Sequence, residues 1–142
     1  MRRPLLLPFL VSCFAFLWLW AAWAPVDRFD WFLENILVFL CVPAVVLTYR
    51  RFRFSDLSYV LLTVFVCMHV VGSHWSYARV PWPDWQTLGF PRNEYDRIVH
   101  FSYGFLLAIP VREVIARLTG RTGASSAYYT VEFILATSAL YE

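Results

Sequence analysis

The sequence contains no lysine and little charge of either sign. Only 15% of its 142 residues are charged, all twelve basic residues are arginines, and the formal net charge is +2. The absence of lysine has no clear structural cause and fits codon bias. A net charge this small, without a basic stripe that carries interleaved aromatic side chains, argues against nucleic acid as a partner.

Cysteine pairs and the common catalytic motifs are also missing. Cys13, Cys41 and Cys67 all lie inside apolar runs and form no Cys-x-x-Cys pair, so we expect buried small hydrophobic residues. The chain has no His-Glu-x-x-His motif, no Gly-x-Ser-x-Gly motif, no phosphate-binding loop and no dinucleotide fingerprint. Three histidines are too few for a membrane desaturase, and five glycines without paired broken helices argue against an inverted-repeat transporter.

Apolar surface is what the sequence has in excess. Hydrophobic residues make up 60% of the chain and aromatic residues 20%, and the mean hydropathy is +0.55. A soluble domain of this length cannot cover so much apolar surface, whereas a bilayer accepts stretches of about 20 apolar residues. The composition therefore predicts an all-α, polytopic transmembrane helix bundle that forms a single domain over residues 1–142.

Short charged or proline-containing stretches divide the chain into five apolar segments. We expect helices at about residues 5–24, 31–49, 57–77, 95–118 and 127–142. Ser55 and Asn93 are candidate N-caps, and Gly120 is a candidate C-cap. The fifth helix reaches only about 24 Å when the sequence stops at Glu142, less than a bilayer core of about 30 Å. We therefore expect four complete spans and a truncated fifth helix.

The first apolar segment has two interpretations. Arg2 and Arg3 precede it, and the Ala-Trp-Ala stretch at 22–24 is compatible with signal-peptide cleavage. The apolar run is, however, longer than the typical signal-peptide core of about 7–15 residues. Tryptophans near its far end, Trp18 and Trp20 among them, are typical of a membrane interface. We favour a retained transmembrane helix.

Arginine distribution predicts the orientation. One set of chain ends and connections carries seven of the twelve arginines, at Arg2, Arg3, Arg50, Arg51, Arg53, Arg117 and Arg121. The connections on the opposite side mix both signs of charge. By the positive-inside rule, the N-terminus faces the cytoplasm and the connections after the first and third helices face outward. The chain is then a multi-pass membrane protein.

Polar residues gather at one depth near the outer surface. Asp96 and His100 are four residues apart and therefore share one helix face. His74 lies roughly 26 Å above the cytoplasmic start of the third helix, and Tyr77 follows three residues later. Glu142 ends the fifth helix at about 24 Å on the same side. Ionisable groups inside membrane helices are costly, so this layer is the candidate functional site.

Two imidazoles and two carboxylates at one depth suggest two kinds of chemistry. In the first, His100 is a base or ligand, Asp96 orients it, and His74 and Glu142 are catalytic partners across the bundle. In the second, the same four residues bind a divalent metal. Depth alone does not show whether the side chains point toward one another.

A substrate for such a site would be a lipid or an envelope precursor. Arg97 and Arg92 are candidate contacts for an anionic headgroup or a polyprenyl phosphate, and Tyr77 is a third candidate substrate-binding residue. The rival interpretation is structural: Asn93 and Asp96 cap a helix, and polar side chains hold helices or a partner together. The sequence therefore leaves three functions open: an enzyme, a non-enzymatic membrane component and a small-solute transporter. It also allows a homo-oligomer.

A second polar layer is expected near the cytoplasmic end. Arg112 and Glu113 follow Pro110 on the fourth segment, and Glu132 lies about 8 Å into the fifth. The simplest interpretation is pairing of Glu113 or Glu132 with Arg112 or Arg117, or contact of these side chains with lipid headgroups. His69 lies between the two layers and is the candidate intermediate of a sparse proton path.

Several stretches resemble the YjdF-type family of bacterial inner-membrane proteins. The resemblance covers about residues 54–142, through the runs at 54–59, 69–77 and 92–101 and the pairs Arg112-Glu113 and Tyr141-Glu142. It implies a multi-pass membrane domain, in which members continue past the Tyr-Glu pair with further acidic residues. Trp75 stands where a tyrosine is expected. The Asp-Arg-x-x-His-Phe stretch at 96–101 also resembles, more distantly, VanZ-like membrane proteins linked to glycopeptide tolerance.

Overall fold

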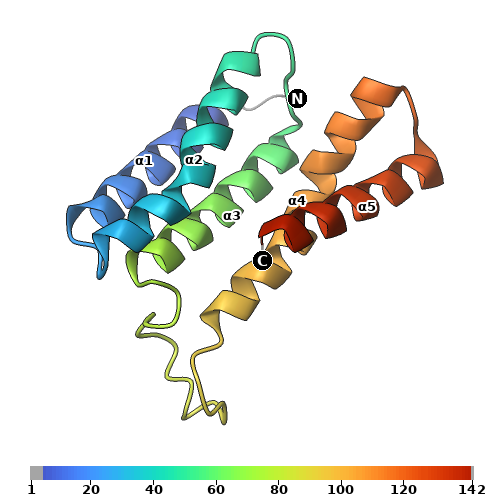
Figure 1. Cartoon of the computed structure of the whole chain (residues 1–142). Helices are drawn as coiled ribbons and strands as arrows, with labels where there is room; N and C mark the ends of the chain where they lie inside the picture. Colours follow the sequence, from blue (N-terminus) through green and yellow to red (C-terminus); the bar gives the residue numbers. More distant parts are fainter. Residues whose placement is uncertain (1–4, 142) are drawn as a thin grey trace.

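The computed structural model describes residues 5–141 and consists of five α-helices, with no strand in that range (Figure 1). The helices are α1 (Leu6–Trp23), α2 (Arg28–Thr48), α3 (Asp56–His74), α4 (Tyr95–Thr119) and α5 (Gly123–Tyr141). Within the described residues, α1 to α4 are long and apolar enough to cross a membrane, and α5 does not meet the same criterion. The predicted all-α transmembrane bundle is confirmed.

Helix α3 is the centre of the arrangement. It packs against α1 and α2 on one side and against α4 on the other, and α5 packs against α4 (Figure 1). Many large apolar side chains point outward, including Phe16, Leu47 and Phe105, each at least 70% exposed. Such exposure suits an acyl-chain environment and not water.

A buried amide connects the first three helices. Asn35 on α2 is fully buried, and its Oδ1 accepts a hydrogen bond from the Trp18 indole on α1 at 2.8 Å. Its Nδ2 donates to the Ser73 hydroxyl on α3 at 3.2 Å and to the Trp31 carbonyl at 2.8 Å. Every polar atom of this amide has a partner, so it stabilises the packing of α1, α2 and α3.

Local capping explains several helix ends. Ser55 caps α3 as predicted, because its hydroxyl accepts from the Ser58 N–H, and Gly120 ends α4 in the left-handed conformation at φ +66°. Helix α2 starts three residues before the prediction because the Asp27 carboxylate accepts from the first free N–H groups. At α4 the N-cap position belongs to Glu94, while the Asn93 side chain accepts from the Tyr95 N–H at 2.9 Å.

Helix α3 ends at His74, three residues before the predicted end. Ser76 and Tyr77 adopt positive φ angles of 46° and 51°, and the Tyr77 N–H donates to the Gly72 carbonyl at 2.8 Å. The chain therefore reverses and directs the Tyr77 ring back toward α3. The connection that follows, residues 75–94, leads to α4 and includes the buried Val80, whose carbonyl accepts from the Asn93 amide at 2.8 Å.

Candidate functional site

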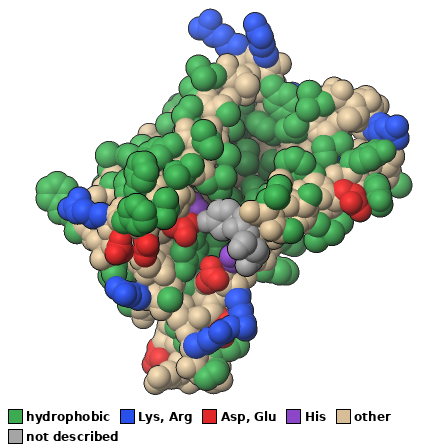
Figure 2. All heavy atoms as spheres, in the orientation of Figure 1, with side chains coloured by type: hydrophobic (Ala, Val, Ile, Leu, Met, Phe, Trp, Pro, Cys, Tyr) green, Lys and Arg blue, Asp and Glu red, His purple; other side chains and the backbone are tan. Residues whose placement is uncertain are grey.

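A cavity of about 380 Å³ lies between α2 and α3 on one side and α4 and α5 on the other. Figure 2 shows this face of the molecule hollowed, with hydrophobic side chains in the hollow. The apolar part of the lining comes from Leu37, Val38, Cys41, Leu62, Phe65, Val66, Val99, Leu107, Val111 and Phe133. The volume and the lining are those of a small-molecule or acyl-chain site.

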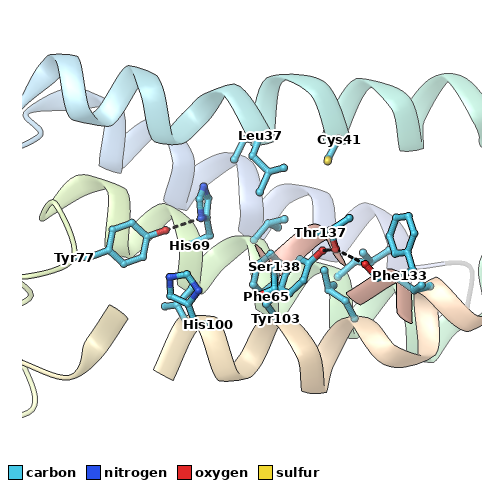
Figure 3. Close-up of a pocket in the computed structure, with 16 residues that line it drawn as sticks. Leu37, Cys41, Phe65, His69, Tyr77, His100, Tyr103, Phe133, Thr137 and Ser138 are labelled. Carbon is cyan, nitrogen blue, oxygen red and sulfur yellow. Dashed lines mark hydrogen bonds between the residues drawn. The ribbon is translucent and has the colours of Figure 1, made fainter. Parts of the chain in front are cut away.

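Polar side chains gather at one end of this cavity. Figure 3 shows Tyr77 and His69 in contact there, with His100 of α4 beside them. The Tyr77 hydroxyl lies 2.6 Å from Nδ1 of His69, and Nε2 of His69 lies 2.9 Å from the Glu34 carbonyl. His69 is only 3% exposed. One imidazole thus connects α3 to α2 and holds a tyrosine at the cavity wall.

His100 and Asp96 form the pair that the helix spacing predicts. Nε2 of His100 lies 3.3 Å from Oδ1 of Asp96, one turn earlier on α4. The His100 side chain lines the cavity and is 32% exposed, while that of Asp96 is 56% exposed. A carboxylate on one ring nitrogen fixes the orientation of the imidazole, as in acid–base sites.

Both candidate substrate-binding arginines contact the same carboxylate. Glu94, at 8% exposure, accepts from Arg92 at 3.1 Å and from Arg97 at 2.9 Å. The two guanidinium side chains are themselves more than 60% exposed. Their charge is therefore partly balanced within the protein, and an anionic headgroup has to share them with Glu94.

His74 lies apart from the cavity. Its Nδ1 donates to the Ala21 carbonyl at 2.9 Å, and its ring stacks on Trp20 at a centroid distance of 4.6 Å. It is 7% exposed and does not line the cavity. These contacts connect the end of α3 to the end of α1, so the structure does not bring His74 and His100 into one cluster.

The remaining predicted partner, Glu142, is outside the described residues. Within residues 5–141, no three side chains of the His, Cys, Asp and Glu types lie close enough to hold a metal ion. The four-residue metal set of His74, His100, Asp96 and Glu142 includes that undescribed residue and stays a prediction, as do the catalytic roles.

Sequence reasoning did not place Tyr103 and Thr137 in the candidate site, and it named His69 only as the intermediate of a sparse proton path. His69 was expected between two polar layers but contacts Tyr77, and Tyr103 of α4 bonds Thr137 of α5 at 2.6 Å. Thr137 donates in turn to the Phe133 carbonyl at 2.7 Å. The signal available was helical spacing: Tyr103 follows His100 by three residues and therefore lies on the same face of α4.

At the opposite end of the bundle, Glu113 forms contacts other than those predicted. Its carboxylate accepts from the Ser55 N–H at 3.0 Å and from the Ser58 hydroxyl at 2.7 Å. Arg112 donates to the Ser126 hydroxyl at 3.1 Å and so connects α4 to α5. No direct ion pair between these arginine and glutamate side chains occurs in the described part of the chain.

Comparisons with known proteins agree on a membrane protein. Residues 6–142 match the model of a family described as "Predicted membrane protein (DUF2238)". The chain is also 32% identical over 119 residues to the inner membrane protein YjdF of Escherichia coli strain K12. That alignment covers 82% of this chain and 57% of the relative, so the chain spans little more than half of the curated protein it matches. No solved structure matches it.

The family and sequence matches and the long apolar helices both indicate that the protein is located in the inner membrane. The curated relative is an inner membrane protein, and four described helices are long and apolar enough to span a bilayer. The chain is therefore a multi-pass protein of the bacterial inner membrane, and the multiple spans are those that the apolar segments predicted.

Proposed function

Because the chain belongs to the DUF2238 family of predicted membrane proteins, we propose a function within the bilayer: binding a lipid or lipid-linked envelope precursor. The ligand's apolar tail lies in the cavity between α2–α3 and α4–α5. Its polar end lies beside His69, Tyr77 and His100. The observation that carries the proposal is one cavity of about 380 Å³ with a mostly apolar lining, in which His69, Tyr77 and His100 lie together at one end (Figure 3).

The chemistry of the lining supports a lipid over a water-soluble ligand. Side chains such as Phe65, Leu107 and Phe133 offer an acyl chain dispersion contacts but offer a sugar or nucleotide no hydrogen bonds. The polar side chains lie at the end nearest the loop at residues 75–94. A ligand with a long apolar tail and a compact polar headgroup fits this arrangement of lining residues.

The proposal includes the orientation of the chain in the membrane. Arg50, Arg51 and Arg53 follow α2, and Arg117 and Arg121 lie near the end of α4, at the end of the bundle opposite His100. The positive-inside rule then favours a cytoplasmic N-terminus and an outer-leaflet position for the polar end of the cavity. A ligand headgroup would approach from the outer leaflet.

Specific roles follow for the polar residues. His100 is the candidate base or ligand-binding group, and Asp96 orients it from 3.3 Å. Arg97 and Arg92 are candidate contacts for an anionic part of the headgroup, shared with Glu94. If the bound lipid is also processed, His100 is the residue whose replacement stops turnover without emptying the cavity.

Photocrosslinking tests the binding site directly. The purified chain in lipid nanodiscs is labelled with a phospholipid that carries a diazirine in its acyl chain, and the labelled peptides are mapped by mass spectrometry. We expect label on cavity residues of α3, α4 and α5. Leu107→Trp fills the cavity and should reduce that label about tenfold, the equivalent of about 1.4 kcal/mol.

The matched control is Phe105→Trp, because Phe105 is on the same helix but is 70% exposed on the outer surface. It should leave cavity labelling unchanged. Equal labelling of the wild-type chain and Leu107→Trp would contradict the proposal. A thermal unfolding curve for each variant in the same nanodiscs separates exclusion of lipid from loss of fold.

A second candidate function, a non-enzymatic structural or partner-binding role, has its own supporting observation. His69 and His74 each bond a main-chain carbonyl of a neighbouring helix, on Glu34 and Ala21. Such bonds hold membrane helices together without any ligand. If His100→Ala and Asp96→Asn only lower expression and stability and leave bound lipid unchanged, this second role is favoured.

A further inference from the structure

A second cavity, of about 320 Å³, lies between α1, α2 and α3 at the end of the bundle where α2 ends and α3 begins. Its lining is mainly apolar and includes Phe14 of α1, Val45 of α2 and Leu62 of α3. The hydroxyl of Thr63, which also lines it, donates its proton to the Tyr59 carbonyl at 2.8 Å within α3. The interior of this cavity therefore suits a hydrocarbon chain.

This second cavity is a groove that opens toward the surrounding acyl chains. Val11 of α1 and Val46 of α2 line it and are 55% and 65% exposed. Along α2 the lining runs from Cys41 to Tyr49, which is about 12 Å at the helical rise per residue. Half of a bilayer core is about 15 Å thick. The groove therefore has nearly the depth of the acyl region of one leaflet.

Basic side chains lie at the end of this groove. Cζ of Arg53 is 5.0 Å from the centre of the Tyr49 ring, which lines the groove. Arg50 and Arg51 directly follow Tyr49, and all three arginines are exposed. Figure 2 shows arginine side chains extending from the top of the molecule, where Figure 1 places the connection between α2 and α3. The cation–π contact holds one positive charge at the end of an apolar groove.

These three arginines, at positions 50, 51 and 53, are not neutralised by a carboxylate in the described part of the chain. Among residues 5–141 none of them forms an ion pair. The neighbouring acidic residues are Asp56, in the first turn of α3, and Glu113, whose carboxylate accepts from Ser55 and Ser58 instead. The planar guanidinium groups are therefore available to an external anion, and phosphate is the anion that their paired N–H donors fit best.

We propose that the groove binds one acyl chain of an anionic phospholipid, with the lipid phosphate held by the three arginines. A zwitterionic lipid is a poorer ligand because its own cation would lie beside three unpaired positive charges. The inference goes beyond the proposed function and is independent of it. Cys41, Leu62 and Val66 line both cavities and so lie between the two sites.

The test uses two photoreactive probes with identical acyl chains, a phosphatidylglycerol and a phosphatidylcholine that each carry a diazirine in one chain. Each is added at the same mole fraction to phosphatidylcholine nanodiscs that hold the purified full chain, and labelled peptides are mapped by mass spectrometry. We expect about tenfold more label in the groove from the anionic probe, because arginines near a membrane surface attract anionic lipids. Because a nanodisc presents the same lipids on both faces, the result does not depend on the orientation of the chain.

Arg53→Gln and Arg121→Gln are the matched pair of variants. Each removes one exposed arginine that stacks on a tyrosine, at 5.0 Å from the Tyr49 ring and 5.2 Å from the Tyr129 ring. Arg121 lies between α4 and α5, and neither of these helices lines the groove. Arg53→Gln should reduce the preference about threefold, and replacing all three groove arginines by glutamine should bring it to about one. Arg121→Gln should retain the preference.

A second pair of variants tests the groove itself. Val45→Trp fills the groove and should reduce label from both probes, whereas Leu47→Trp is on the same helix, 80% exposed and outside the lining, and should leave it unchanged. Thermal unfolding in the same nanodiscs separates a blocked groove from a lost fold. The arginine variants, at exposed positions, decide the question if Val45→Trp does not fold.

Equal labelling of the groove by the two probes overturns the inference, as does a preference that survives loss of the three arginines. An equal loss in Arg121→Gln would show a general attraction of the basic end without a site, and overturns it as well. Label confined to the cavity between α2–α3 and α4–α5 removes this second site and leaves the proposed function intact. Label confined to the groove between α1, α2 and α3 has the opposite meaning.

Discussion

Gly72 determines where the Tyr77 ring can lie. The ring occupies the space that a Cβ at position 72 would need, and the reversed turn at Ser76 and Tyr77 holds it there. Gly104 is different, because a Cβ there would meet only a methyl group of Ile134 at an ordinary contact distance of 3.8 Å. A side chain at position 72 would therefore clash with its surroundings, whereas a side chain at position 104 would not.

Gly72→Ala should therefore destabilise the protein. The added methyl group forces the Tyr77 ring or the α3 backbone to move, which costs about 1–3 kcal/mol in a packed site. Gly104→Ala is the matched control and should be neutral or slightly stabilising, because alanine favours helix more than glycine. Thermal unfolding of both variants in nanodiscs measures the difference. A Gly72→Ala protein as stable as Gly104→Ala would show that Tyr77 is not held against α3.

Spacing along a helix was predictable from the sequence, but the direction of a side chain relative to other helices was not. Counting residues correctly relates Asp96 to His100, because both lie on one helix at i and i+4. It fails to relate His74 to His100, because the rotation of α3 is set by packing against α1, α2 and α4 together. His74 consequently faces the Ala21 carbonyl.

Helix α4 stabilises the start of α3 through a single carboxylate. Glu113 accepts from the Ser55 N–H and from the Ser58 hydroxyl, in the first turn of α3, where N–H groups have no helical partner. It also accepts from the Ser55 hydroxyl, the group that caps the helix. A negative charge at a helix N-terminus is favourable, so this contact holds two helices together and completes a cap.

We expect Glu113→Ala to loosen the first turn of α3, at a cost of about 1 kcal/mol because Ser55 still caps part of the turn. Hydrogen exchange of the amides at 55–60 measures the effect, and exchange in the middle of α3 should stay unchanged. Glu132→Ala on the exposed face of α5 is the control and should leave these amides protected. Unchanged exchange at 55–60 in Glu113→Ala would exclude the capping role.

Element types were easier to predict than element ends. Long apolar runs predict five helices, and Ser55 and Gly120 mark two boundaries through caps that act within a few residues. The early end of α3 was not predictable, because residues 75–77 contain no proline or glycine. That end depends on contacts between Tyr77 and His69, which only the folded chain provides.

Charge is distributed unevenly between the two ends of the whole molecule. The connection after α2 carries Arg50, Arg51 and Arg53, while residues 75–94 combine arginines with Asp84 and Glu94. At Asp84 the Thr87 hydroxyl donates at 2.7 Å to the carboxylate, and this hydrogen bond holds the pKa of Asp84 below its ordinary value. Asp84 therefore stays ionised to a lower pH than an ordinary aspartate, and within residues 75–94 the two acidic side chains offset the two arginines.

Cysteine accessibility in intact cells measures the proposed orientation. In a chain whose three cysteines are replaced by alanine, Gln86→Cys places a thiol on the exposed loop before α4, and Arg51→Cys places one after α2. We expect a membrane-impermeant maleimide to label position 86 from outside and position 51 only after the membrane is permeabilised, because basic connections stay in the cytoplasm. The reverse pattern would place the His69–Tyr77 end of the cavity in the inner leaflet. The lipid ligand would then enter from the cytoplasmic side, with the same contacts to Tyr77.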